Sequence, residues 1–145
     1  MEVTRDRPSR TIYLSQAKLV EDVLTCFNMT NCKPAATPLD PGIQLSKAMA
    51  PKNEEEVEYM KRVPYLSAVG SLMYLGQGTC PDISTAVGTL CQFSSNPGPL
   101  HWKALQHVLH YLKGTINWRL ALGGSTPDHL VTGYSDSDFA GNIDS

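Results

Sequence analysis

Apolar residues recur every three or four positions in three stretches of the central chain, residues 65–75, 81–93 and 100–112. This spacing places apolar side chains along one side of an α-helix. Pro81 suits the first turn of the second helix, and prolines within residues 96–99 separate it from the third. The expected buried residues are Tyr65, Val69, Leu72, Met73, Leu75, Ile83, Val87, Leu90, Phe93, Leu105, Val108, Leu109 and Leu112. The pattern predicts a small helical bundle.

Short β-prone runs and one further helix precede this bundle. Residues 2–4 and 11–14 are separated by polar residues and a proline, which predicts an N-terminal β-hairpin. Ser15 is then placed to cap a helix that ends near Asn28. The apolar face of this helix consists of Leu19, Val20, Val23, Leu24 and Phe27.

The composition changes again after Gly114. Residues 118–122 and 129–135 are β-prone, and the glycines and proline between them predict a turn. We therefore expect an α+β fold with a hairpin, a small helical bundle and a C-terminal strand pair that belongs to an incomplete second unit. Strands near the two ends are expected to lack sheet partners, so their edges could pair with another copy.

The segment from residue 32 to residue 52 is rich in proline. Its helix-breaking residues are Pro34, Pro38, Pro41, Gly42 and Pro51. They interrupt helical hydrogen bonding, which predicts a long surface connection. The acidic residues Glu54 to Glu58 that follow indicate the solvated first turn of a helix, where negative charge suits the helix dipole.

Composition excludes several classes of protein. The formal net charge of −2 argues against a strongly cationic nucleic-acid binder, so any such binding would be local. The four cysteines form no C-x-x-C pair, which indicates reduced thiols. Without an apolar run of roughly 20 residues or a secretory signal, we expect an intracellular protein, cytoplasmic or nuclear and not secreted.

Asp136 and Asp138 follow the last β-prone run, where a metal-dependent nuclease presents its first carboxylate. Carboxylate oxygens suit Mg²⁺, although a turn or helix cap is the commoner role for such residues. A two-metal site also needs carboxylates from several other elements. A zinc site on the last central helix is disfavoured, because no cysteine or acid is spaced near its histidines. These are His101, His107 and His110.

Other glycine and aromatic patterns admit two interpretations. Gly70, Gly76 and Gly78 match no phosphate-binding loop, so they predict close helix packing or a helix end. Basic and aromatic residues alternate late in the chain and could contact nucleic acid through phosphates and stacking. The candidates are Trp102, Lys103, Lys113 and Arg119, with Tyr111 and Trp118 nearby. Core aromatics with solvated lysines are the commoner alternative.

Several short motifs in a fixed order resemble those of the Ty1/copia family of retrotransposon reverse transcriptases. They are Ile12-Tyr13-Leu14-Ser15-Gln16, Cys32-Lys33-Pro34, Thr37-Pro38-Leu39, Val69-Gly70-Ser71-Leu72-Met73-Tyr74-Leu75, Pro81-Asp82-Ile83, His101-Trp102, Leu112-Lys113-Gly114-Thr115 and Tyr134-Ser135-Asp136-Ser137-Asp138-Phe139-Ala140-Gly141. The resemblance covers nearly the whole chain. Its specificity comes from the order of the motifs and the matching spacing between them, since each motif alone is weak evidence.

The resemblance implies a position inside a longer Pol polyprotein. Residues 1–14 would be the hairpin after the polymerase palm, 15–114 the helical thumb and connection region, and 115–145 the start of a truncated RNase H-like domain. The parent would copy RNA into DNA and degrade the RNA strand, with Mg²⁺ as its metal. Asp136 would be the first RNase H carboxylate and a metal ligand, and Asp138 a second ligand.

This chain departs from the family in ways that affect function. The family's polymerase site contains adjacent aspartates, and this sequence has no Asp-Asp pair. Cys80 stands where the family usually has arginine, and His107 and His110 lie near positions that are often basic. We therefore expect no activity from the chain alone and no tightly bound cofactor. Expected partners are an RNA–DNA hybrid or template–primer duplex and the remainder of the polyprotein.

Three roles remain open at this point. The chain could be the duplex-holding fragment of the element, or a non-catalytic module that binds nucleic acid or a protein partner. It could also be a remnant without a selected role, whose exposed apolar surface leads to self-association. An active metal nuclease ranks last among these hypotheses.

Overall fold

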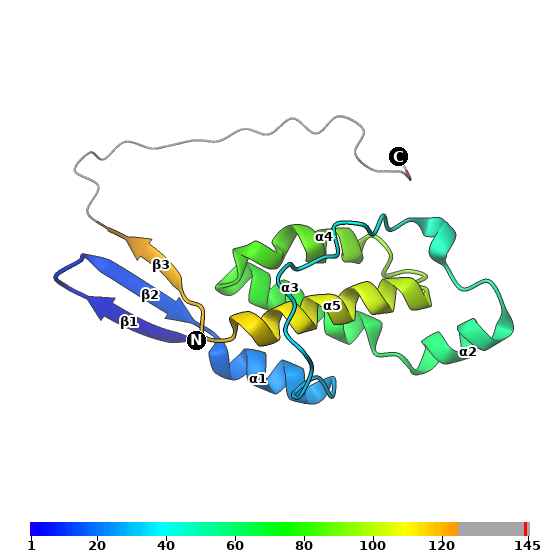
Figure 1. Ribbon diagram of the computed structural model, residues 1–145, viewed down its shortest axis with the longest axis horizontal. Coiled ribbons are helices and arrows are strands. Elements are labelled where there is room, and N and C mark those ends of the chain that lie inside the picture. The colour runs from blue at the N-terminus through cyan, green and yellow to red at the C-terminus, as the bar shows by residue number, and fades with distance from the viewer. Residues whose placement is uncertain (125–143, 145) are drawn as a thin grey trace.

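The computed structural model describes residues 1–124 and Asp144. In these residues a helical unit carries a three-stranded antiparallel sheet at one end (Figure 1). The elements are β1 (Glu2–Asp6), β2 (Thr11–Ser15), α1 (Ala17–Cys26), η1 (Lys47–Met49), α2 (Glu54–Arg62), α3 (Tyr65–Gly78), η2 (Pro81–Ile83), α4 (Ser84–Cys91), α5 (Pro99–Thr115) and β3 (Leu120–Gly123), where η marks a 3₁₀ helix. The α+β class is confirmed, whereas the RNase H-like unit stays a prediction.

The predicted hairpin is confirmed, and its second strand also pairs with β3. Val3 lies opposite Leu14 in the β1–β2 pair, and Leu14 lies opposite Leu120 in the β2–β3 pair. Within the described residues β1 and β3 are the outer strands of the sheet, so the expectation that strand edges could pair with another copy stays a prediction. The other expected strand, residues 129–135, falls outside the described residues. The helical unit therefore lies in sequence between two neighbouring strands.

A buried polar contact joins the sheet to the helices. Gln16, rather than the predicted Ser15, occupies the cap position of α1, although the Ser15 hydroxyl accepts a hydrogen bond from the Ala17 N–H at 3.2 Å. The Gln16 side chain is buried, and its Oε1 accepts a hydrogen bond from the Thr79 hydroxyl at 3.0 Å. A Cβ at Gly78 would overlap the Gln16 amide, which confirms close packing for this glycine.

Residues 32–52, which we call the strap, form the predicted long connection with little regular structure. The strap is not confined to the surface, because Leu45 is buried. Its other apolar residues in contact with the core are Ala35, Leu39, Ile43 and Met49. Prolines exclude helical hydrogen bonding but not burial, so an irregular segment supplies part of the core.

Two histidines of α5 hold the strap in place. His110 Nδ1 donates a hydrogen bond to the Lys33 carbonyl at 2.6 Å, and the Ala35 N–H donates to the His110 carbonyl at 3.1 Å. Further along the helix, His101 Nε2 donates to the Ser46 carbonyl at 3.1 Å. The strap is therefore fixed at two places on one helix (Figure 1).

His101 is fully buried and uses both ring nitrogens. Its Nδ1 accepts a hydrogen bond from the Gly98 N–H at 2.8 Å, while Nε2 donates to Ser46. The ring stacks on Phe93 with 4.2 Å between ring centroids. Burial lowers the pKa of His101, and the Ser46 carbonyl and Asp144 partly offset this effect. These contacts select the neutral imidazole.

The predicted core helices are confirmed, with one helix divided. Pro81 starts the short turn η2, and α4 continues from Ser84. Leu75, Leu90 and Leu105 are fully buried where α3, α4 and α5 meet. Met73 was expected in the core but is 42% exposed. Leu72 faces the core, and consecutive helical residues point about 100° apart, so its neighbour turns outward.

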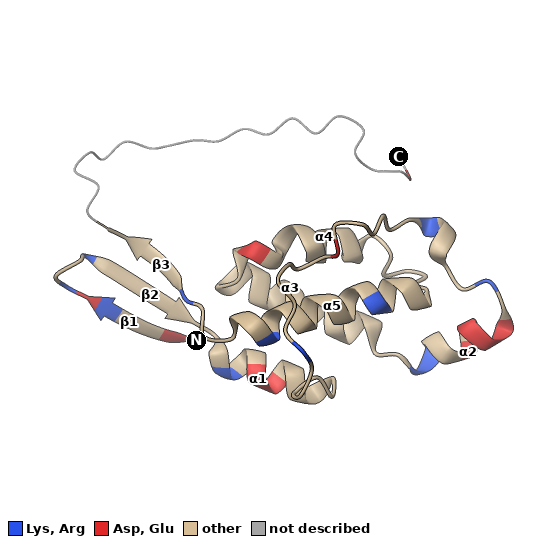
Figure 2. Cartoon of the chain, in the orientation of Figure 1, with Lys and Arg blue, Asp and Glu red and all other residues tan. Residues whose placement is uncertain are grey.

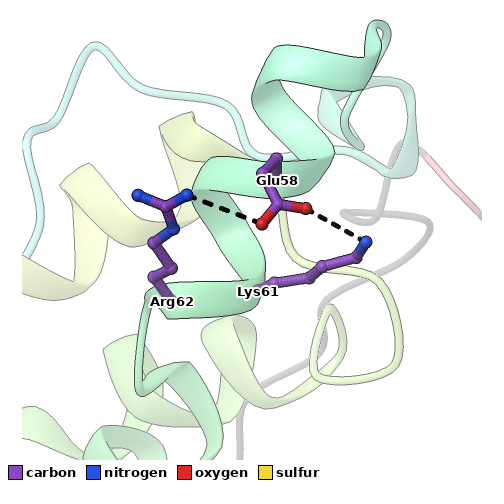
Figure 3. A network of polar contacts seen from close by, with 3 residues as sticks. All are labelled: Glu58, Lys61 and Arg62. Carbon is purple, nitrogen blue, oxygen red and sulfur yellow. Dashed lines mark hydrogen bonds and ion pairs between the residues drawn. The ribbon is translucent and has the colours of Figure 1, made fainter.

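The acidic residues after the strap form the first turn of α2, as predicted. Asn53 caps this helix, since its Oδ1 accepts a hydrogen bond from the Glu56 N–H at 2.8 Å. Glu58 lies 3.2 Å from Lys61 Nζ and 3.6 Å from an Arg62 nitrogen (Figure 3). All three side chains are exposed, so water screens these ion pairs and their contribution to stability is small.

Truncation of the core side of α5 should be strongly destabilising. We expect Leu105→Ala to lower the free energy of unfolding by about 2–5 kcal/mol, because it removes a fully buried side chain and leaves a cavity. The matched control is Leu100→Ala on the same helix, where the side chain is exposed and the loss should be about 0.5 kcal/mol or less. Urea denaturation measures both, and equal losses would contradict the packing described.

Acidification should destabilise the fold through His101. Its pKa is lowered in the folded state, so the unfolded chain binds more protons, and stability falls as the pH drops below the ordinary value of 6.5. We expect His101→Gln to flatten the dependence of Tm on pH between pH 7 and pH 5. His110→Gln, which removes a histidine with a single carbonyl contact, serves as control. An unchanged slope in His101→Gln would contradict this role.

Candidate nucleic-acid interface

Helix α5 carries three of the four basic and aromatic candidates. Trp102 is only 9% exposed and belongs to the core, which matches the commoner role for such aromatics. Lys103 is exposed and Lys113 is half-buried. Lys103, Gln106, His110 and Lys113 follow one another at intervals of three or four residues, so they form the outer stripe of α5.

The connection from α5 to β3 presents the fourth candidate and an aromatic neighbour. Arg119 is exposed, and Trp118 before it is 67% exposed. Trp118 packs edge-on against Tyr111 with 6.4 Å between ring centroids. The backbone N–H of Trp118 donates a hydrogen bond to the Thr115 carbonyl at 2.8 Å, which fixes the turn after α5. Trp118, rather than Trp102, therefore offers an accessible ring beside basic residues.

Tyr111 links this connection to the turn before α4. Its hydroxyl donates a hydrogen bond to Asp82 Oδ2 at 2.6 Å. Burial, followed by the interactions with Asp82, raises the pKa of Tyr111 to about 12, so the phenol stays protonated at neutral pH. The position of Trp118 thus depends on contacts across two helices that no local sequence pattern indicates.

Basic residues gather away from the α3–α4 pair. Figure 2 shows Lys and Arg on the hairpin, on α1, on the strap, on α2 and along α5, whereas α3 and α4 carry no charge. Asp82 is the one charged residue between positions 63 and 100. The cationic side chains of the described residues therefore lie outside α3 and α4.

The exposed sides of α3 and α4 form a continuous surface, which we call the uncharged face. Its residues are Leu66, Ser67, Gly70, Met73, Tyr74, Gln77, Ser84, Thr85 and Gly88. A groove of about 150 Å³ separates the two helices. It is lined by Met73, Gly76, Gln77, Ser84, Val87, Gly88 and Cys91.

At two positions of the uncharged face, no contact within the described chain explains why the residue is glycine. A Cβ at Gly70 or Gly88 would meet no atom within 4 Å. The predicted close helix packing is therefore wrong for Gly70, whereas at Gly76 an added Cβ would lie 3.3 Å from Ser84 Oγ. Glycine inside a helix is about 1 kcal/mol less favourable than alanine. The sequence reveals the glycines, but only the structure shows the open space above them.

The predicted metal ligands are not tested by the described part of the chain. Asp136 and Asp138 lie outside it. Residues 1–124 and Asp144 contain no group of three or more His, Cys, Asp or Glu residues that could hold a metal ion. Burial raises the pKa of the Cys32, Cys80 and Cys91 thiols, which disfavours reactive thiolates. Among the described residues, no helix is long and apolar enough to cross a membrane.

Comparisons with known proteins support the family resemblance. The chain is 50% identical over 144 residues to the retrovirus-related Pol polyprotein from transposon TNT 1-94 of Nicotiana tabacum, which covers 99% of this chain and 11% of that protein. The Pol polyprotein from transposon RE1 of Arabidopsis thaliana is 39% identical over 92% of this chain and 8% of its own length. Secreted RxLR effector protein 161 of Plasmopara viticola is 52% identical over 59% of this chain and 60% of its own length.

No family model matches the chain, and no solved structure matches it significantly. The chain spans only about a tenth of the length of the transposon polyproteins that it matches. Its homologues thus include retrovirus-related Pol polyproteins of plant transposons, and the similarity to them extends over nearly all of its residues.

Proposed function

We propose that the chain is the duplex-holding segment of a copia-type Pol polyprotein, corresponding to the thumb and connection region that leads into RNase H. The parent would synthesise DNA on an RNA template and degrade the RNA strand of the resulting hybrid. The segment positions the duplex for these reactions and performs neither one alone. An intracellular location, cytoplasmic or nuclear, accompanies this role.

The observation that carries the proposal is the uncharged face with its two open glycines. Gly70 lies at the centre of the exposed side of α3, and Gly88 lies at the centre of the exposed side of α4. Without side chains they leave the helix backbone accessible there, although nothing within the described chain requires them to be glycine. An external partner that approaches the helix backbone closely would require the absence of a Cβ at both positions. Glycine is favoured where a backbone and a ligand come into close contact.

The minor groove of an A-like duplex fits such a face. This groove is wide and shallow and displays sugar edges and 2′-hydroxyls, which proteins recognise mainly by shape. Ser71 and Thr89, which follow Gly70 and Gly88 at the border of this face, donate their hydroxyls to carbonyls of their own helices, so their oxygens can accept hydrogen bonds from 2′-hydroxyls. Uncharged side chains also avoid the repulsion that carboxylates would experience near phosphates.

The phosphate contacts would come from the end of α5 and the connection after it. Lys113 and Arg119 supply positive charge there, and the exposed ring of Trp118 supplies a stacking surface. Lys103 adds a cation further along the same helix. Because basic residues are few, we expect weak affinity that depends on the rest of the polyprotein.

Catalysis would belong to the parent rather than to this segment. The sequence contains no adjacent aspartates of the polymerase type. Asp136 and Asp138 would be the first metal ligands of the RNase H site, and a two-metal site needs further carboxylates from other elements. Mg²⁺ would there activate water and stabilise the phosphodiester leaving group.

The open glycine gives a test with opposite effects on stability and on binding. Gly70→Ala should raise the free energy of unfolding by about 0.5–1 kcal/mol, because alanine favours the helix. Gly70→Leu should also fold, since open space lies above the position. We expect Gly70→Leu to weaken binding of a labelled 20-base-pair RNA–DNA hybrid at least tenfold, and Gly70→Ala to weaken it less.

Thr25→Leu is the matched control for this experiment, because Thr25 is an exposed helical residue on α1, away from the uncharged face. Its affinity for the hybrid should stay within twofold of the wild type. Equal affinities of the wild type and Gly70→Leu would contradict contact at the uncharged face. Absence of hybrid binding by the wild type would favour the protein-interaction module or the remnant.

The basic residues give an independent test through salt dependence. Each phosphate contact contributes about 0.9 to the slope of log affinity against log salt. We expect Lys113→Gln and Arg119→Gln each to reduce the measured slope by about that amount. Lys61→Gln on α2, where the lysine pairs with Glu58, should leave the slope unchanged. Slopes that are the same in all variants would exclude Lys113 and Arg119 as phosphate contacts.

A further inference from the structure

One face of the three-stranded sheet consists almost entirely of apolar side chains. Val3, Leu14 and Leu120 lie opposite one another in one row, and Arg5, Ile12 and Leu122 do so in the next row. Cross-strand neighbours and alternate residues of one strand share a face. We call Val3, Ile12, Leu14, Leu120 and Leu122 the apolar sheet face, with Arg5 as its one charged member.

No described element covers this face. Val3, Ile12 and Leu122 are exposed, Leu14 and Leu120 are half-buried, and none of these five apolar residues packs against the hydrophobic core. Figure 1 shows the sheet projecting from the helical unit near α1 and the end of α5. A small sheet ordinarily needs its apolar face packed against another layer. The described residues therefore leave uncovered an apolar surface that is suited to burial against another layer.

The chemistry of this face restricts its occupant. Five apolar side chains would contact apolar side chains of the partner, and Arg5 requires a carboxylate because a buried unpaired charge is very unfavourable. A symmetric face-to-face pairing of two copies would instead bring two Arg5 guanidinium groups into one small contact. A second copy is thus a poor occupant.

The size of the face points to a partner on the same polypeptide. A standard interface between separate proteins uses about 20–30 residues from each side, far more than this face supplies. A small contact suffices where a covalent linkage holds the two surfaces at high effective concentration. The TNT 1-94 Pol polyprotein contains about eight times as many further residues as it shares with this chain.

We propose that the apolar sheet face is a docking surface for another part of the same Pol polyprotein, an apolar segment that places one carboxylate opposite Arg5. This inference rests on the polyprotein origin in the proposed function and not on duplex binding. Its role is to fix the sheet, and with it the two ends of the helical unit, against the neighbouring part of the polyprotein.

Cysteine labelling tests this docking directly. Val3→Cys places a thiol on the apolar sheet face, and Thr4→Cys places one on the opposite face of the same strand, where the native residue is also exposed. Each variant is made in the free chain and in the TNT 1-94 Pol polyprotein with this chain replacing the segment that aligns with it. The rate of maleimide modification at each position is measured by peptide mass spectrometry.

We expect Val3→Cys to react at least tenfold more slowly in the polyprotein than in the free chain, and Thr4→Cys to change by less than twofold. Adding Arg5→Glu should restore fast labelling of Val3→Cys. Equal rates for Val3→Cys in both contexts would overturn the proposal. Slow, concentration-dependent labelling in the free chain would overturn it in favour of a second copy.

Hybrid binding by the same free-chain variants separates this proposal from the proposed function. Val3→Cys should bind the RNA–DNA hybrid within twofold of the wild type, because the apolar sheet face is not the duplex surface. If the free chain binds no hybrid while Val3→Cys is protected in the polyprotein, duplex holding fails and the docking surface stands. A large loss of hybrid affinity in Val3→Cys would instead assign the face to the duplex.

Discussion

Burial of α5 is the interaction on which the rest of the structure depends. Eight of its 17 residues are buried, and it contacts α1, α3, α4 and η1. One side of the helix forms the core with α3 and α4, and His101 and His110 hold the strap with their ring nitrogens. Its C-terminal end lies near the start of α1 and leads into β3, which allows β3 to pair with β2. Sheet and bundle are thereby joined.

Local patterns predict the local parts of this fold. Apolar spacing correctly predicts α1, α3, α4 and α5, and the polar, proline-containing turn predicts the hairpin. The β2–β3 pairing joins residues more than 100 positions apart, and no local pattern specifies such a partner. The prolines of the strap predict a surface segment, so the sequence does not indicate that Leu45 is buried. Met73 faces outward because Leu72 beside it occupies the core.

The candidate site was less predictable, for the same physical reason. Basic residues near the end of α5 are evident from the sequence, but which tryptophan is accessible depends on packing. Trp102 is enclosed by the core, whereas Trp118 lies outside it against the edge of Tyr111. The sequence likewise shows Gly70 without showing that its surroundings are open. The uncharged face, the basic end of α5 and the apolar sheet face are the three surfaces that the proposed duplex holding and docking would use.

The most direct test of duplex holding is an NMR titration of the ¹⁵N-labelled chain with a 20-base-pair RNA–DNA hybrid. Duplex holding predicts shift changes at the amides of Leu66, Gly70, Tyr74 and Gly88, together with the indole N–H of Trp118. The amides of α2, at the opposite end of the molecule from the sheet, should stay unchanged (Figure 1). Changes confined to α2 or to the apolar sheet face, or no change at saturating hybrid, would contradict duplex binding at the uncharged face.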